Sequence, residues 1–292
     1  MSAKAYFVAT DTETFDPTPA AGGHWGESLI SGPAVAGLAA WALERDYGQP
    51  GFLPARFTVD LVRPAHQVPC RVLTRLIRDG RRVRFAECVV LQGDSLVARA
   101  SAVYYRQSAP PPGAEWTPAA TFSAPQGADG DGLLVGSDGQ GWSVLGAEHQ
   151  NTAVKRAYYR GADVVTGEPV TPFVRCVIVA EAAANMVVNM GTAGIGYING
   201  DLTLSLSRLP NSEFIGVQGD SRSAADGIAV GTATMFDSAG PIGTAMITAL
   251  ANPASQIDFA GRARTEAPGA ELFNEQRDGT ARFSDEPRGA AR

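Results

Sequence analysis

An acidic residue stands where a β-strand is expected to begin. Across residues 202–207, leucines alternate with hydroxyl-bearing residues, which is the period of a half-buried strand. Asp201 precedes this run and follows Gly200, although aspartate is depleted in strands. A carboxylate at a strand end can act as a general base or hold a water molecule. The alternative is a turn aspartate that binds its own backbone after Asn199 and Gly200.

Histidines and cysteines add no obvious site. The three histidines are scattered, with no Cys or His at metal-ligand spacing, so the sequence predicts no metal and no cofactor. His24 precedes an expected helix and could line a pocket mouth; the alternative is a surface loop histidine. The cysteines form no paired motif and are expected to be reduced core thiols: Cys70, Cys88 and Cys176.

The bulk composition is that of an ordinary globular chain. It has 292 residues, a net charge of −6 and 45% apolar residues, which allows one large domain or two modest ones. No basic excess points to nucleic acid, and no apolar run is long enough to span a membrane. The first fifteen residues or so lack the features of a secretory signal. We therefore expect a cytoplasmic protein.

The order of the expected elements repeats once along the chain. In the first half, a strand over 6–15 and a helix over 33–47 precede strands over 54–63, 68–78, 81–92 and 95–106. In the second half, a helix within 174–191 precedes strands over 199–208, 213–222, 227–236 and 241–250. The segments RFTVDLVRP and GDLTLSLSRLP mark the repeat, because their arginines, Arg63 and Arg208, lie 145 positions apart.

The repeat predicts two similar units joined by an irregular segment. We expect domains over 1–108 and 139–261, a linker rich in Pro, Gly and Ala over 109–138, and a surface tail over 262–292. A long helix beside an antiparallel sheet must bury its apolar face on that sheet. Two such units can pair their sheets edge to edge, which covers exposed edge strands.

An ordered set of short motifs resembles one enzyme family. An Arg-Pro pair, RDGRR, ADGIA and DSAGPIG occur in that order, within segments such as FTVDLVRPAHQVP and INGDLTLSLSRLP. Over roughly residues 5–105 and 140–252, the chain resembles the TesB-like (type II) acyl-CoA thioesterases, especially their actinobacterial relatives. The resemblance implies an α+β tandem, or double, hot-dog fold, in which each half is a long helix wrapped by an antiparallel sheet.

The resemblance also implies catalytic positions. The family's second hot dog carries an Asp, a Ser or Thr, and a Gln that hold the attacking water. Asp201 falls at the Asp position and Ser221 at the Ser/Thr position. The Gln position falls at Ile247, which departs from the pattern, and the adjacent Thr248 points to the other face of a regular strand. The implied catalytic residues are Asp201, Ser221 and Thr248.

Three further residues are candidates for substrate binding. His24 precedes the first helix, Asn185 lies inside the second, and Ser223 is a close neighbour of Ser221. Asn185 would face either an acyl pocket or the solvent. Backbone N–H groups at the start of a long helix could polarise the carbonyl of the substrate.

The resemblance implies hydrolysis of fatty acyl-CoA thioesters to free acid and CoA without a cofactor. A thiolate, with a pKa of about 8.5, leaves with little protonation, so no histidine acid is required. The alternative, favoured by Ile247, is a catalytically impaired hot-dog protein that binds acyl-CoA or another acyl ligand without turnover. A third hypothesis is a structural partner that oligomerises through its sheet. A homodimer or higher homo-oligomer is the family expectation.

Overall fold

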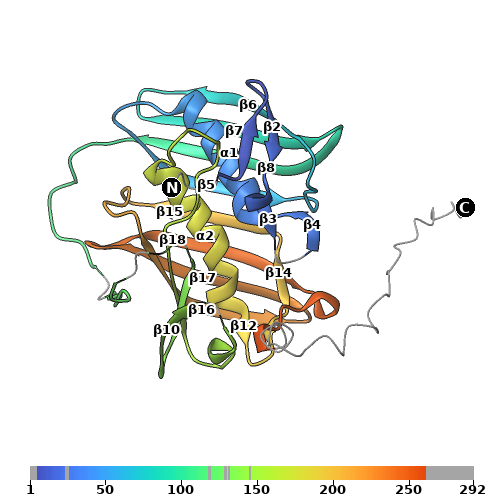
Figure 1. Ribbon diagram of the computed structural model, residues 1–292. Helices are drawn as coiled ribbons and strands as arrows, with labels where there is room; N and C mark the ends of the chain where they lie inside the picture. The colour runs from blue at the N-terminus through green and yellow to red at the C-terminus, as the bar shows by residue number, and fades with distance from the viewer. Residues whose placement is uncertain are drawn as a thin grey trace, which may run out of the picture.

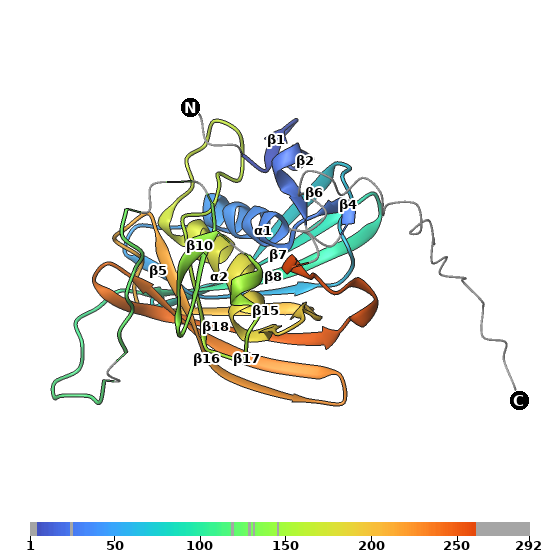
Figure 2. The same ribbon diagram turned by 60° about the horizontal axis from the view of Figure 1, so that its bottom comes forward.

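Two long helices pack against one face of a curved antiparallel sheet (Figure 1, Figure 2). The computed structural model describes residues 5–23, 26–117, 120–127, 130, 132–144 and 146–260. We name the sheet face toward the helices the inner face and the opposite one the outer face. The α+β class expected from the sequence is confirmed, with one long helix and its own strands in each half.

The elements follow the expected order, with additional short strands in both halves. The first half contains β1 (Phe7–Ala9), β2 (Thr14–Pro17), β3 (Gly22–Gly23), β4 (Gly26–Ile30), α1 (Gly32–Tyr47), β5 (Phe52–Leu61), β6 (Cys70–Asp79), β7 (Val83–Gln92) and β8 (Ser95–Arg106). The second half contains β9 (Leu134–Ser137), β10 (Gln140–Val144), β11 (Lys155–Tyr159), α2 (Pro172–Asn189), β12 (Met190–Gly191), β13 (Gly194–Ile195), β14 (Tyr197–Asn199), β15 (Asp201–Leu206), β16 (Ile215–Ala225), β17 (Ile228–Asp237) and β18 (Gly240–Ala251).

The two halves join through their central strands. The main sheet runs in the order β1-β2-β6-β7-β8-β5-β15-β18-β17-β16-β11-β9-β10, with β14 also pairing with β18. At its middle, β5 pairs antiparallel with β15, and Thr58 lies directly opposite Thr203. These two threonines also occupy matching positions in the sequence repeat, so a local twofold axis passes between them. The duplication seen in the sequence therefore becomes one continuous sheet.

The helices cross the inner face in opposite directions. Gly32, the first residue of α1, lies against Glu181 in the second half of α2. At the other crossing, Thr171, which caps the start of α2, donates a hydrogen bond to Glu44 near the end of α1. Each helix has a proline in its first turn, where the missing N–H costs no helical hydrogen bond.

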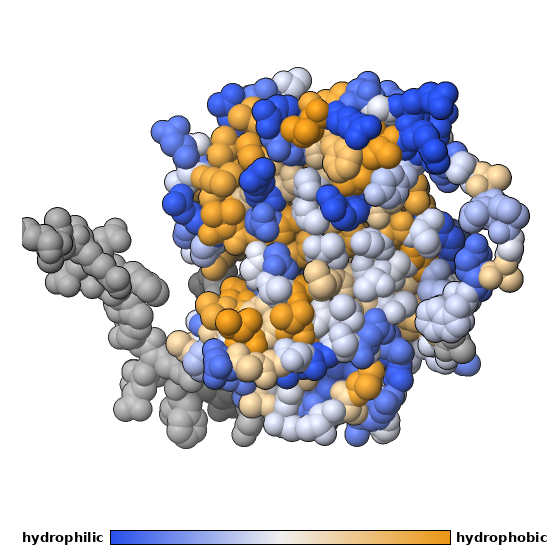
Figure 3. All heavy atoms as spheres, turned by 180° about the vertical axis from the view of Figure 1, so that it is seen from behind, coloured by the Kyte–Doolittle hydropathy of each residue, from blue (hydrophilic) through white to orange (hydrophobic). Residues whose placement is uncertain are grey.

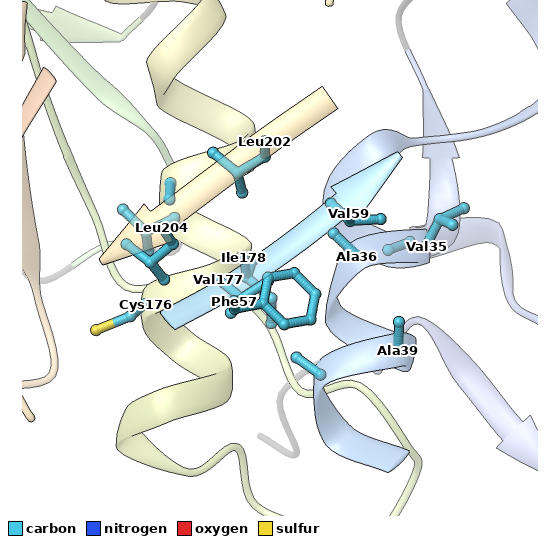
Figure 4. Packing of buried hydrophobic residues seen from close by; sticks show 14 of the residues in the cluster. Val35, Ala36, Ala39, Phe57, Val59, Cys176, Val177, Ile178, Leu202 and Leu204 are labelled. Atoms are coloured by element: carbon cyan, nitrogen blue, oxygen red, sulfur yellow. The ribbon is translucent and has the colours of Figure 1, made fainter. Parts of the chain in front are cut away.

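The core lies between the helices and the inner face (Figure 4). Phe57 of β5, Leu202 and Leu204 of β15, and Ile178 of α2 are fully buried there. Burying each such side chain contributes roughly 1.5–3 kcal/mol, which fixes the helices on the sheet. Phe57 also packs edge-on against Phe173, with ring centroids 6.1 Å apart. The cysteines are free thiols buried in this core: Cys70, Cys88 and Cys176.

Side chains of the second-half strands alternate between the two faces. On β18, Ile247 is 1% exposed on the inner face, whereas Met246 and Thr248 point outward. Figure 3 shows the molecule from behind, with the outer face toward the viewer. Its exposed apolar residues on β17 and β18 are Ile228, Val230, Met246 and Leu250.

Part of the expected linker is anchored on the outer face. The ring of Phe122 stacks on Phe236 at 5.1 Å, and a Cβ on Gly216 would lie 2.4 Å from Phe122. β9 begins at Leu134, also inside the expected linker. The tail over 262–292 lies outside the described residues. Within the described residues, only α2 has the length and apolar composition of a membrane span, and 83% of that segment is buried as a core helix.

Candidate active site

Three buried polar side chains interrupt the apolar face of helix α2, whose other charged residue, Arg175, is half-buried near its start. Glu181, Asn185 and Asn189 are spaced four residues apart, so they lie on one face of the helix, and all three are buried. We name these three side chains the polar row. Buried polar groups need hydrogen-bond partners, and this requirement explains the contacts below. The sequence carried the signal as E-x-x-x-N-x-x-x-N, but the prediction from sequence considered Asn185 alone.

Glu181 lies against the first turn of α1. Asn199 Nδ2 donates a hydrogen bond of 3.1 Å to Glu181 Oε1. A Cβ on Gly32 would lie 2.0 Å from the same oxygen, so this approach requires glycine. Burial raises the pKa of Glu181 to about 7, and the hydrogen bond from Asn199 opposes that rise. A carboxyl group that titrates near neutral pH suits a general base.

The first turn of α1 leaves a backbone donor beside this carboxyl. Pro33 has no N–H, and the N–H groups of Ala34 and Val35 both donate to the carbonyl of Ser31. The Ser31 side chain makes no capping hydrogen bond. Among the described residues, no acceptor binds the N–H of Gly32. This donor lies at the positive end of the helix dipole, where a developing oxyanion is stabilised.

A register shift at Gly200 turns Asn199 toward the helices. β14 and β15 both pair with β18, but their registers differ by one residue on the two sides of Gly200. One extra residue in a strand reverses the alternation of its side chains. Asn199 therefore faces Glu181, whereas Asp201, only two positions later, lies on the outer face.

The rest of the polar row forms a continuous chain of hydrogen bonds. Asn185 Nδ2 donates to the Tyr197 carbonyl at 2.9 Å, and Asn189 Nδ2 donates to Asn185 Oδ1 at 2.9 Å. Arg222 Nε in turn donates to Asn189 Oδ1 at 3.1 Å. Asn185, a predicted substrate-binding residue, thus lies in the same row as Glu181. The row leads from the buried carboxyl to an exposed arginine.

A buried tyrosine lies near the same carboxyl. Burial raises the pKa of Tyr6 well above its usual range, and the charges of Tyr159 and Glu181 add to the rise. The side chains of Tyr6 and Tyr159 are also hydrogen-bonded to each other. Within the part of the chain that the structure describes, the surroundings of Glu181 are therefore polar and supply no cation that would keep it ionised.

Two of the predicted catalytic residues are joined on the outer face. Asp201 Oδ1 accepts a 2.8 Å hydrogen bond from the Thr248 backbone N–H, and its Oδ2 accepts from Thr248 Oγ1. Both partners lie on the side of the sheet away from the helices, and Thr248 is exposed. The carboxylate of Asp201 thus ties β15 to β18, as an aspartate that binds neighbouring backbone would.

Ser221 is not brought to this pair. Its hydroxyl is 2.8 Å from the hydroxyl of Thr232 on β17. Both β18 and β17 lie between β15 and β16, and strands are about 4.8 Å apart, so roughly 14 Å of sheet separates Ser221 from Asp201. The structure therefore does not bring the two side chains to one water molecule, and their joint role stays a prediction. Ser223 is likewise exposed on β16.

Two further predicted positions are Ile247 and His24. Ile247, at the expected Gln position, is buried on the inner face and offers no polar group there. His24 lies outside the described residues. Within the part of the chain that the structure describes, no three His, Cys, Asp or Glu side chains gather as metal ligands.

Comparison with known families agrees with this architecture. Residues 22–105 match the acyl-CoA thioesterase N-terminal domain, and residues 115–250 match the acyl-CoA thioesterase C-terminal domain. The two matched domains make the chain a double hot-dog thioester hydrolase, with one helix-and-sheet unit in each domain. The chain belongs to the acyl-CoA thioesterase family.

Solved structures share the fold at low sequence identity. The tesB protein of Mycobacterium avium subs paratuberculosis is 16% identical, with a TM-score of 0.60 over 85% of this chain and 96% of that one. The acyl-CoA thioesterase II TesB2 of Mycobacterium marinum is 14% identical, with a TM-score of 0.58 over 84% and 94%. A hot-dog protein of unknown function from Alicyclobacillus acidocaldarius is 14% identical, with a TM-score of 0.62 over 85% and 96%. No curated protein sequence matches the chain significantly.

Proposed function

We propose that the chain hydrolyses fatty acyl-CoA thioesters to free acid and CoA where Gly32, Glu181 and Asn199 meet. The observation that carries the proposal is the buried carboxyl of Glu181 set against the first turn of α1. This arrangement combines a general base with a backbone N–H donor, and thioester hydrolysis by water uses both. The family supplies the class of reaction.

In the proposed mechanism, the Glu181 carboxylate takes a proton from a water molecule while the water oxygen forms a bond to the thioester carbon. The N–H of Gly32 stabilises the oxyanion of the tetrahedral intermediate. The C–S bond then breaks and the CoA thiolate leaves, taking the proton from Glu181 as the site is reset. The hydrogen bond from Asn199 holds the carboxyl in place and favours its ionised form.

This proposal assigns the base to Glu181 rather than to Asp201. The two oxygens of Asp201 are already engaged by Thr248, and both long helices of the described structure begin on the inner face. Glu181 has the burial and the adjacent helix end that Asp201 lacks. The earlier hypothesis, in which Asp201 acts with Ser221, stays testable by the same experiment.

We also propose that the protein is cytoplasmic and that it associates into a homodimer or higher oligomer. The apolar residues on the outer face of β17 and β18 support self-association, since exposed apolar patches mark interaction sites. Sedimentation at several protein concentrations would measure it, and a monomer throughout would remove this part of the proposal.

Release of free thiol from acyl-CoAs of different chain lengths tests the reaction directly. Wild type would be compared with Glu181→Gln, which keeps the shape of the side chain and removes the base. Asp201→Asn and Ser221→Ala serve as the matched comparison on the outer face. We expect the Glu181 variant to lose most turnover and the other two to keep it.

Two other results would change the proposal. Turnover that is lost in Asp201→Asn but kept in Glu181→Gln would mean that Asp201 on β15 is the general base. Acyl-CoA binding without turnover in wild type would favour the catalytically impaired alternative, with Ile247→Gln as the variant to test next.

A further inference from the structure

Arg222 is held rigidly at the exposed end of the polar row. It lies on β16 opposite Gly231, where a Cβ would come within 2.3 Å of Val188 of α2, so sheet and helix are in close contact. Its Nε donates to Asn189, and its guanidinium carbon lies 5.3 Å from the ring centroid of Tyr197. An exposed arginine fixed from two sides loses little further freedom when it binds a ligand.

Among the described residues, most of the hydrogen-bonding capacity of this guanidinium has no partner. A guanidinium has five N–H donors, and the contact with Asn189 occupies the one on Nε. Within the described residues Arg222 forms no ion pair, whereas Arg208 and Arg84 each meet an aspartate. The two terminal nitrogens of Arg222 can therefore form a bidentate contact with an anion.

Among the described residues, no cation of this kind lies beside Glu181. Its partners are the amide of Asn199 and the backbone of Gly32. The polar row covers eight residues of α2 between Glu181 and Asn189, or about 12 Å at 1.5 Å per residue. Arg222 thus stands two helical turns beyond the proposed reaction site, at the end of hydrogen bonds that run from Asn185 through Asn189.

We propose that Arg222 binds a phosphate group of the CoA portion of the substrate, and so selects CoA thioesters over thioesters that lack phosphate. This inference rests on the proposed reaction at Glu181. The thioester would lie at that buried end, and the long, uncharged pantetheine arm would extend along the row toward Arg222. The arginine would act in binding and take no part in the chemical step.

The test compares two substrates that share one thioester. Octanoyl-CoA carries the phosphates, and octanoyl-N-acetylcysteamine has the same acyl group on a short thiol without any phosphate. For Arg222→Ala we expect the KM for octanoyl-CoA to rise roughly tenfold with kcat little changed, as for loss of one charge-assisted contact. Turnover of the phosphate-free substrate should not change. Arg99→Ala, on an exposed arginine of the first half, is the control.

A purely structural role for Arg222 would impair both substrates equally, and that result would overturn the inference. Equal KM values for octanoyl-CoA in wild type and Arg222→Ala would overturn it too, while leaving the reaction at Glu181 intact. Calorimetric titration with CoA alone tests the contact without any turnover. If wild type hydrolysed neither substrate but bound CoA more tightly than Arg222→Ala, the proposed reaction would fail and the phosphate contact would stand.

Discussion

The duplicated fold gives the molecule two places where the start of one helix meets a glutamate of the other. At the start of α2, the Thr171 hydroxyl accepts from the Val174 N–H and donates to Glu44, so the helix end is closed by side chains. At the start of α1, Ser31 makes no such cap, and Gly32 lets the carboxyl of Glu181 approach the backbone.

The difference shows how one architecture can serve stability at one crossing and chemistry at the other. Burial raises the pKa of both glutamates, but Glu44 is only partly buried and its carboxyl is bound by a hydroxyl that also caps the helix. Glu181 is buried beside the first turn of α1, where the Ser31 side chain accepts no hydrogen bond from the backbone N–H groups. Helix capping and oxyanion binding use the same N–H groups, so a site must leave at least one of them free.

Glu181→Gln should have the largest effect on activity. Removing a general base costs typically 10²- to 10⁴-fold, so we expect kcat to fall by at least about 100-fold with the fold retained. Glu44→Gln is the matched variant at the closed crossing and should keep kcat within about twofold of wild type. Thiol release measures both, and circular dichroism checks the fold. Equal losses in the two variants would remove the functional distinction between the crossings.

Gly32→Ala should come next, because its Cβ would lie 2.0 Å from Glu181 Oε1 and must displace the carboxyl. We expect a tenfold or greater loss of kcat, since displacement of catalytic groups by about 1 Å can cost 10²-fold. Gly191→Ala is the control, because a Cβ there would meet no atom within 4 Å. Activity retained in Gly32→Ala would mean that the carboxyl is not held against the backbone during turnover.

The pH dependence should separate Glu181 from an ordinary surface carboxyl. Its pKa is raised to about 7 in the folded protein from 4.5, so the folded state holds a proton that the unfolded state has lost between these values. The free energy of unfolding should therefore fall as pH rises from about 4.5 to 7, while kcat/KM rises with the ionised fraction. Urea titrations of wild type and Glu181→Gln would measure the first effect. A wild-type slope equal to that of the variant would contradict it.

Hydrophobic patterns in the sequence predict the helices and most strands but not the local details that distinguish the two crossings. Hydrophobic periodicity placed the first helix at 33–47, against Gly32–Tyr47 observed, because apolar spacing and flanking Pro and Gly residues agree there. Periodicity did not indicate β9, β10 or β11, which adjoin a stretch rich in Pro and Gly. It also treated 199–208 as a regular strand, which puts Asn199 and Asp201 on one face.

The register shift at Gly200 explains why the site proposed here differs from the one predicted from the sequence. A single extra residue moves Asn199 inward and leaves Asp201 outside, and no count of alternating residues can show that before pairing is known. The glycine in Asn-Gly-Asp was the available signal, since glycine within a strand often marks a bulge. A polar residue every fourth position of an apolar helix was the second signal, and it pointed to Glu181.

Thr171→Ala tests the crossing at the start of α2, where side chains cap the helix. Loss of the cap should reduce the free energy of unfolding by about 1 kcal/mol, the usual cost of an N-cap threonine, with activity unchanged. Urea denaturation measures the loss, and Thr166→Ala, whose hydroxyl binds only a backbone carbonyl, is a control of the same residue type. A large fall in kcat would show that the closed crossing also takes part in the reaction.

Substitutions on the outer face should have the smallest effect on activity and stability. Asp201→Asn keeps the size of the side chain but weakens its two hydrogen bonds to Thr248, so we expect a stability loss of about 1 kcal/mol or less and kcat within about twofold of wild type. Ser221→Ala should change even less, because its partner hydroxyl on Thr232 can turn to solvent. Denaturation and thiol release on the same samples would separate the two effects. A loss of kcat greater than the loss of folded protein, in either variant, would mean that substrate reaches the outer face and that the base belongs on β15.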